Sequence, residues 1–355
     1  MTTTAKDLWG LGGTRRLYLE APLRPVSGEL IQPTGFPSIG AAHFRKPGSH
    51  VTMLIVESEQ SMANRLEGVC WDSAAQRPVA DLEGMPYVHV DVQVARGETR
   101  PTSSLTEAHR LHSAYIVDAQ GTFMKDFAEE AGIADDSPVD MQRLARTVFK
   151  YDPNSLVHGV FFANLNGRAR LTRALYAMIL GEDAEPVHYG GVKVDHIQSS
   201  RGAAGRDAEA GYGNIPYART LWTCGRIRAS FTLDLDLLQS YGLPEEALRF
   251  LVALSLWKIR RLLDGGMRLR TLCDLETDDD SGGIAARRPQ GWPLPPLPDL
   301  TAALRESLEA CRRAGLFADP PVTRLMWTEA RAGATRRTKE QVAASQEEGG
   351  FVADR

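Results

Sequence analysis

Apolar and polar residues alternate in three stretches of this chain, which is typical of β-strands that bury one face. Residues 87–95 place a valine at every second position, and residues 225–238 alternate apolar side chains with charged and hydroxyl side chains. Residues 267–275 repeat the pattern. Two mostly apolar runs, 51–56 and 156–165, predict strands that are buried on both faces.

Helical patterns lie between these strands. Ser58 can cap a helix that runs to Val69, and the sequence Ser-Leu-Thr-Glu at 104–107 is a capping box that predicts another helix. Residues 168–180 predict a third helix, and the longest one begins at Pro244 and stops at the glycine pair 265–266. Because strands and helices mix without strict alternation, we expect an α+β fold with a largely antiparallel sheet.

Glycine, proline and small polar residues mark the irregular segments. Residues 199–214 and 281–298 predict long loops, and residues 331–355 form a polar tail that we expect to be disordered. The expected organisation is one domain over residues 1–330 that carries these two loops as insertions.

The composition limits the classes of function. The net charge of −4 differs from the strongly basic balance of free-standing DNA-coating proteins, so any nucleic acid must bind a local basic surface. No signal peptide or membrane span is evident, which predicts a soluble cytoplasmic protein with no membrane partner. We expect reduced thiols and no zinc site, because the cysteines are not closely paired; they are Cys70, Cys224, Cys273 and Cys311.

The helix that follows Ser58 carries a first candidate site. Ser61, Asn64 and Arg65 share a polar face near its N-terminus, where a hydroxyl, an amide and a guanidinium suit phosphate oxygens. The alternative is a solvated face on which arginine pairs with glutamate. We expect Arg65 to add little to stability, and Glu67 or Glu20 to be its partner if its role is internal.

A second candidate is the basic stretch 249–270, which holds six Lys and Arg residues and one acid. Arg226, Arg228, Arg268 and Arg270 project from predicted strands, and a sheet that presents arginines beside open loops can hold single-stranded RNA. The alternative is a solvated helix face, since an acidic run follows directly.

A third candidate lies in residues 168–173, where Arg168, Arg170 and Arg173 occur together. In the predicted helix Arg170 and Arg173 share a face. Phosphate binding and simple solvation remain equally open for this group.

Signals for an enzyme are weaker. His109 and His112 could seat a metal ion at helical spacing, and Asp234 with Asp236 could hold a divalent ion on a strand, but no third ligand is evident. Neither a phosphate-binding Walker motif nor a nucleophile elbow occurs. We therefore expect no catalytic residue, no metal and no cofactor.

Six collinear blocks of the sequence resemble one family, the Cas-seven group of RAMP proteins in type I-U (type I-G) CRISPR systems. The resemblance implies a modified RRM-like, ferredoxin-like core. It also implies a non-catalytic subunit, many copies of which coat a CRISPR guide RNA within a Cascade complex and present the guide to target DNA. The expected partners are therefore guide RNA, target DNA through the guide, further copies of the chain and other Cascade subunits. The blocks are 16–44, 54–72, 102–116, 159–175, 190–197 and 253–276.

Carried onto this chain, the resemblance makes Ser61, Asn64 and Arg65 the leading guide contacts. The aromatic signature of ordinary RRM sheets is absent, which argues against base stacking on the sheet. Two rivals stay open: a metal-independent RAMP endoribonuclease that uses His109 or His158 to process CRISPR RNA, and a structural filament protein. Secondary candidates within the same blocks are Arg16, Arg110, Lys193, Arg268 and Arg270.

Overall fold

The computed structural model describes most of the chain. The described residues are 10–36, 39–94, 97–134, 138–163, 165, 169–194, 196 and 215–329. The predicted loop at 199–214, the polar tail at 331–355 and the candidate Arg168 lie outside them.

An eight-stranded sheet forms the centre of the fold, and every pair of neighbouring strands in it is antiparallel. The α+β fold with a largely antiparallel sheet is therefore confirmed. The strands run in the order β14 (Met267–Arg270), β15 (Cys273–Thr277), β1 (Arg16–Pro25), β13 (Ile215–Asp234), β12 (Leu175–Lys193), β5 (Thr52–Glu57) and β4 (His43–Arg45), and β16 (Ala285–Arg288) also pairs with β1.

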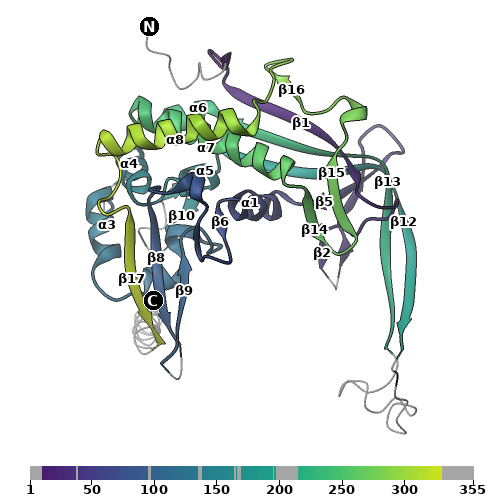
Figure 1. Ribbon diagram of the computed structural model, residues 1–355, viewed down its shortest axis with the longest axis horizontal. Helices are drawn as coiled ribbons and strands as arrows, with labels where there is room; N and C mark the ends of the chain where they lie inside the picture. Colours follow the sequence, from purple (N-terminus) through teal and green to yellow (C-terminus); the bar gives the residue numbers. More distant parts are fainter. Residues whose placement is uncertain are drawn as a thin grey trace, which may run out of the picture.

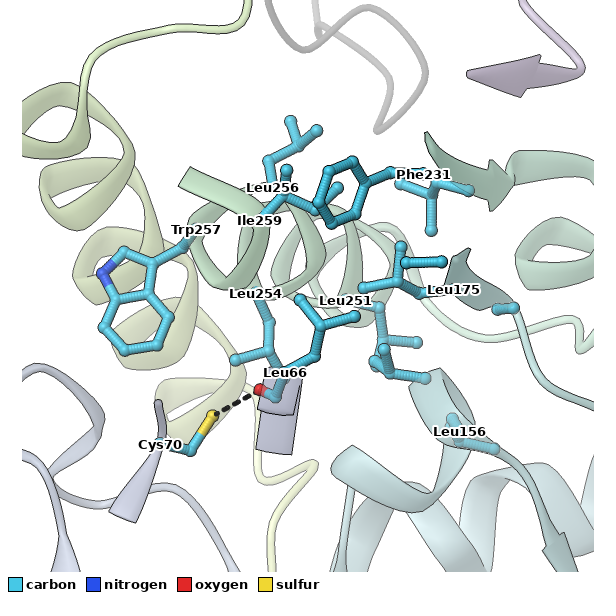
Figure 2. Packing of buried hydrophobic residues seen from close by; sticks show 14 of the residues in the cluster. Leu66, Cys70, Leu156, Leu175, Phe231, Leu251, Leu254, Leu256, Trp257 and Ile259 are labelled. Carbon is cyan, nitrogen blue, oxygen red and sulfur yellow. Dashed lines mark hydrogen bonds between the residues drawn. The ribbon is translucent and has the colours of Figure 1, made fainter. Parts of the chain in front are cut away.

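Two helices pack on the buried face of this sheet. They are α1 (Glu59–Gly68) and α7 (Glu245–Asp264), and α8 (Leu297–Arg313) packs against α7 from outside. In Figure 2 side chains of α7 such as Trp257 and Leu251 lie among apolar residues of other elements, including Phe231 of β13. Because it is enclosed from several sides, α7 buries thirteen of its residues.

A three-stranded sheet forms a second layer of structure. Its order is β17 (Val322–Thr328), β8 (Tyr87–Gln93) and β9 (Thr99–Ser103), with β17 parallel to β8. Short helices lie beside it: α2 (Ala114–Val117), α3 (Phe123–Ala131), α4 (Met141–Tyr151) and α5 (Asn154–His158).

The remaining elements are short. Three two-stranded ribbons pair β2 (Gly35–Phe36) with β3 (Gly40–Ala41), β6 (Trp71–Asp72) with β7 (Arg77–Pro78), and β10 (Val160–Phe161) with β11 (Arg170–Leu171). A last helix, α6 (Leu235–Ser240), follows β13, and single 3-10 turns are η2 (Ala80–Leu82), η3 (Arg110–His112) and η5 (Asp279–Ser281).

The molecule has the outline of an arch. The long hairpin of β12 and β13 descends at one end, the three-stranded sheet descends at the other, and α1 lies between them on the inner side (Figure 1). No helix within the described ranges is long and apolar enough to span a bilayer.

The predicted helices at 58–69 and 244–265 are confirmed as α1 and α7. The helix predicted at 168–180 is wrong, because this segment enters β12 at Leu175 and pairs with β13. Leu175, Ala177 and Ile179 face the core in alternation, so sheet pairing overrides a composition that suits helices.

Four further predictions need correction. The apolar run 156–165 holds the end of α5 and the short β10 rather than one strand. The capping box at 104–107 precedes a tight turn and η3 rather than an α-helix. Residues 267–275 form the hairpin of β14 and β15, because Leu272 adopts a positive φ of 59°. The predicted loop at 281–298 contains β16 and the start of α8.

Candidate RNA-binding surfaces

The first candidate group lies where α1 meets β14. Ser58 caps α1 by accepting a hydrogen bond from the backbone N–H of Ser61, at 3.3 Å, and Asn64 is exposed on the next turn. Arg268 of β14 is also exposed. We define the α1–β14 patch as Ser61, Asn64, Arg65, Arg268 and Arg270.

A buried carboxylate joins the two halves of this patch. Glu57 is fully buried at the end of β5, and its Oε1 lies 3.4 Å from Nε of Arg65. Arg65 also donates to the carbonyl of Leu269, and Arg270 pairs with the same glutamate and donates to the carbonyl of Gln32 at 2.9 Å. Two guanidinium groups thus compensate one buried charge.

Arg65 therefore has the internal role that the sequence analysis gave only as an alternative. Its partner is Glu57, not Glu67 or Glu20, and its side chain is only 35% exposed. The expectation that Arg65 adds little to stability is wrong in its premise, since Arg65 is not on a purely solvated face. In this arrangement Asn64 and Arg268 are the patch members whose side chains are exposed to solvent.

The arginines of the open sheet face are paired with carboxylates. Arg228 lies 3.0 Å from Glu182 and 3.5 Å from Glu20, and Arg226 lies 3.6 Å from Glu182. On the same face Arg16 donates to Asp234 at 3.1 Å. The local charge is therefore close to balance, which weakens the attraction of this face for phosphate.

The basic stretch 249–270 is not a continuous surface. Lys258 is fully buried, and three of its arginines pair with acids. These pairs are Arg249 with Glu245, Arg260 with Asp264, and Arg261 with Asp81. Lys193 lies apart from them, exposed on the hairpin of β12 and β13.

Arg110 is a buried residue rather than a surface cation. Its Nε and Nη2 donate to the two carboxylate oxygens of Glu67 at 2.6 and 2.8 Å, and Nη1 donates to the carbonyl of Gly159 at 3.0 Å. The guanidinium is thus held by a bidentate pair inside the protein. This geometry favours a structural role for Arg110 over contact with RNA.

The ion pair continues into a buried polar network. Asn154 donates its amide to Glu67 at 2.8 Å and accepts from the ammonium of Lys258, which also lies 3.0 Å from Nε2 of His158. Burial lowers the pKa of His158 well below its usual value, and the charges of Lys258 and Arg110 add to this effect. The His158 imidazole is therefore neutral at pH 7.

Asp152 in the same region predicts a pH dependence. Burial raises its pKa from 3.8 to about 6, so between these values the native carboxyl holds a proton that the unfolded chain releases. Its contribution to stability must then fall as the pH rises through this window. Asp152→Asn should therefore reduce the loss of stability with rising pH, and it should raise the free energy of unfolding above pH 6 by about 2–3 kcal/mol. Urea unfolding at pH 4.5 and 7 measures this; equal pH slopes for parent and variant would contradict it.

A cavity of about 970 Å³ lies in front of this network. It is lined from α1, η3, α5, β10 and β11, and we call it the His158 cavity. It brings together all three histidines weighed as enzyme-like residues, and three of the candidate arginines. Its charged and histidine lining consists of His109, Arg110, His112, Asp118, His158, Arg170 and Arg173.

Arg170 and Arg173 do not share a helical face, because this segment is β11 and the turn that follows it. Arg170 is exposed and lies 5.3 Å from the ring centroid of Phe161. Arg173 donates to the carbonyls of Glu59 and His158 and to the side-chain oxygen of Gln60. Sequence reasoning missed Phe161, because nothing in its apolar neighbourhood indicates exposure.

No cluster of three or more His, Cys, Asp or Glu residues that could hold a metal ion occurs in the part of the chain that the structure describes. Asp234 and Asp236 do not share a strand face, since β13 ends at Asp234 and α6 begins at Leu235. Asp234 instead caps α6 by accepting from the N–H of Leu237.

Comparisons with known proteins give a match to one family model and matches to chains of solved structures. A chain of a solved structure described as "CRISPR RNA-guided surveillance complex, pre-nicking" is similar at a TM-score of 0.39, with 14% identity over 73% of each chain. No curated protein sequence matches the chain. Residues 17–186 match the family model "CRISPR-associated protein GSU0053", a segment that includes α1 and most of the cavity lining. Just under half of the chain is therefore similar to a family of CRISPR-associated proteins.

Proposed function

We propose that this chain is a guide-RNA-binding backbone subunit of a type I CRISPR interference complex, of the Cas-seven group in type I-G systems. Several copies coat the guide, which then pairs with target DNA, and other Cascade subunits complete the assembly. The subunit itself carries out no chemistry. The family match over residues 17–186 supports a CRISPR role.

The observation that carries the RNA-binding part of the proposal is the α1–β14 patch. Two groups that stand 204 positions apart in the sequence, Arg65 and Leu269, are in contact there. The two elements that carry the patch, α1 and β14, lie on the inner side of the arch (Figure 1), where a strand of RNA would pass between the hairpin and the three-stranded sheet. Exposed Asn64 and Arg268 offer an amide and a guanidinium to its phosphates.

The hairpin supports the proposal of several copies. Beyond a bridge between Trp222 and Ile31, the described outer parts of β12 and β13 pair with each other alone, and apolar side chains there and at Val194 are exposed to solvent. Isolated two-stranded hairpins are marginally stable in water, and an exposed apolar cluster indicates a partner. A neighbouring copy on the same RNA would cover it. The exposed residues are Tyr189, Val192, Val194, Ile215 and Tyr217.

The double variant Asn64→Ala/Arg268→Ala tests the patch. It should weaken binding to single-stranded RNA about tenfold at low salt, because one charged and one neutral phosphate contact are lost. The slope of log affinity against log salt should fall by about 0.7, as expected for one lost phosphate contact to a single strand. Fluorescence anisotropy across a salt series measures both quantities.

Gln239→Ala/Arg313→Ala is the matched control, since both residues are exposed on helices outside the patch. Arg65→Ala is a poorer test, because it also leaves Glu57 short of a partner and should lower stability. If the patch variant binds RNA like the control variant at every salt concentration, the patch is not the guide contact.

A metal-independent endoribonuclease is the second candidate function. The observation in its favour is that His109, His112 and His158 line one cavity together with three arginines. The arginines could stabilise a phosphorane, but Nε2 of His158, the acceptor nitrogen of the neutral ring, already takes a hydrogen bond from Lys258. Its burial behind the cavity wall and its contact with Lys258 favour a binding role instead.

Incubation of the purified protein with repeat RNA in EDTA separates the two functions. We expect no cleavage by the parent chain, and unchanged RNA binding in His109→Ala. RNA products that disappear in His109→Ala, with the melting temperature retained, would establish the endoribonuclease and overturn the backbone proposal.

A further inference from the structure

The described lining of the His158 cavity holds more arginines than acids. Glu67 compensates Arg110, but among the described residues Arg173 donates to backbone carbonyls and an amide oxygen, and Arg170 is exposed to solvent. Asp118 is the one acid in the described lining. A site with this balance attracts an anion.

The cavity wall also holds a buried hydrogen-bond donor without a partner. An ammonium has only donors, so Lys258 donates to Nε2 of His158, and the proton of the neutral ring is then on Nδ1. That Nδ1 has no hydrogen-bond partner among the described residues, and His158 is only 2% exposed. An orphaned buried donor destabilises the protein, and a ligand oxygen that accepted its hydrogen bond would remove this cost.

An aromatic platform lies at the mouth of the same cavity. Phe161 is 44% exposed, and the guanidinium of Arg170 lies 5.3 Å from its ring centroid. An exposed phenylalanine beside an arginine offers a flat surface on which a nucleobase can stack. Among the described residues of β10 and β11, this pair is the one that joins an aromatic ring to a cation.

We propose that the His158 cavity is a nucleotide-binding pocket, in which Phe161 and Arg170 hold the base while Arg173 and His158 face the phosphate and sugar oxygens. The cavity volume of about 970 Å³ exceeds what one nucleotide needs, which leaves room for a strand to enter and leave. The nucleotide can be one unit of a bound RNA strand or a free 5′-mononucleotide. Binding of a nucleotide within an RNA strand rests on the proposed function, whereas binding of a free mononucleotide does not.

The first arm of the test uses free nucleotides. Isothermal titration with AMP and UMP should show binding that neither adenosine nor inorganic phosphate reproduces, since base and phosphate contacts act together. Phe161→Ala and Arg170→Ala should each weaken this binding at least about fivefold, within the range for loss of base stacking. Phe44→Ala is the matched control, because Phe44 is also 44% exposed but lies on β4.

The second arm uses RNA that carries 5-bromouridine. Ultraviolet cross-linking followed by peptide mapping should place a cross-link on the peptide that contains Phe161, and Phe161→Ala should lower RNA affinity while Phe44→Ala does not. If Phe161→Ala weakens the binding of RNA but not of AMP or UMP, the pocket holds a nucleotide of a strand. If it weakens the binding of AMP or UMP but not of RNA, the pocket holds a free nucleotide.

The inference is overturned if Phe161→Ala and Arg170→Ala keep the parent melting temperature and change neither mononucleotide nor RNA binding. In that case a loss of RNA binding in Asn64→Ala/Arg268→Ala would still support the proposed function. Conversely, a pocket that binds AMP in a protein without RNA affinity would support the pocket and overturn the guide-RNA proposal.

Discussion

Arg110→Ala is expected to lower the free energy of unfolding by about 3–5 kcal/mol, the usual cost of removing one partner from a buried ion pair. The substitution leaves the carboxylate of Glu67 buried, with Asn154 as its remaining side-chain donor. It also orphans the carbonyl of Gly159. Denaturant unfolding of the purified chain measures the loss.

Two further variants separate the buried charge from other effects. Arg110→Met/Glu67→Gln removes both charges but keeps an acceptor for Asn154, so it should be less destabilised than Arg110→Ala alone. Arg305→Ala breaks an exposed pair with Asp81 and should cost less than about 1 kcal/mol. If Arg110→Ala unfolds like Arg305→Ala and binds RNA more weakly, Arg110 contacts RNA and its contact with Glu67 is dispensable.

Shortening the hairpin should abolish cooperative assembly while leaving the body folded. His188 of β12 pairs directly with Thr220 of β13, so an Asn-Gly turn can replace residues 189–219 without a shift of register. This deletion removes the exposed apolar side chains, which form the surface that we propose contacts the next copy. Cooperativity on RNA several sites long should fall by about 100-fold or more, the scale of avidity from linked contacts.

Native mass spectrometry of protein on RNA of increasing length counts the bound copies. With the parent chain, most RNA molecules should carry either no copies or a full set. With the shortened chain, RNA molecules with intermediate numbers of copies should be common. Val192→Ser/Ile215→Ser keeps the hairpin length and should weaken cooperativity in the same direction. A shortened chain that fills RNA as the parent does would show that copies meet through another surface.

Local signals in the sequence were enough for several elements. Ser58 as an N-cap predicts α1, and the alternation over residues 225–238 predicts the second half of β13, because caps and periodicity depend on neighbours in the chain. The segment that enters β12 was mistaken for a helix. Its leucine and alanine content favours helix, and pairing with β13 decides otherwise.

The sequence by itself determined which polar and cationic side chains are candidates for RNA binding. It singled out Asn64 and Arg65 in one segment and Arg268 in another. Only the tertiary structure decided which of these side chains are free of internal ion pairs and can reach RNA. Arg65 pairs with Glu57, Arg110 with Glu67, and Lys258 lies within the core, since each buried acid or amide must be matched by a donor from a distant segment. Which cation meets which acid depends on packing between α1, α5, α7 and β14, and no local pattern carries that information.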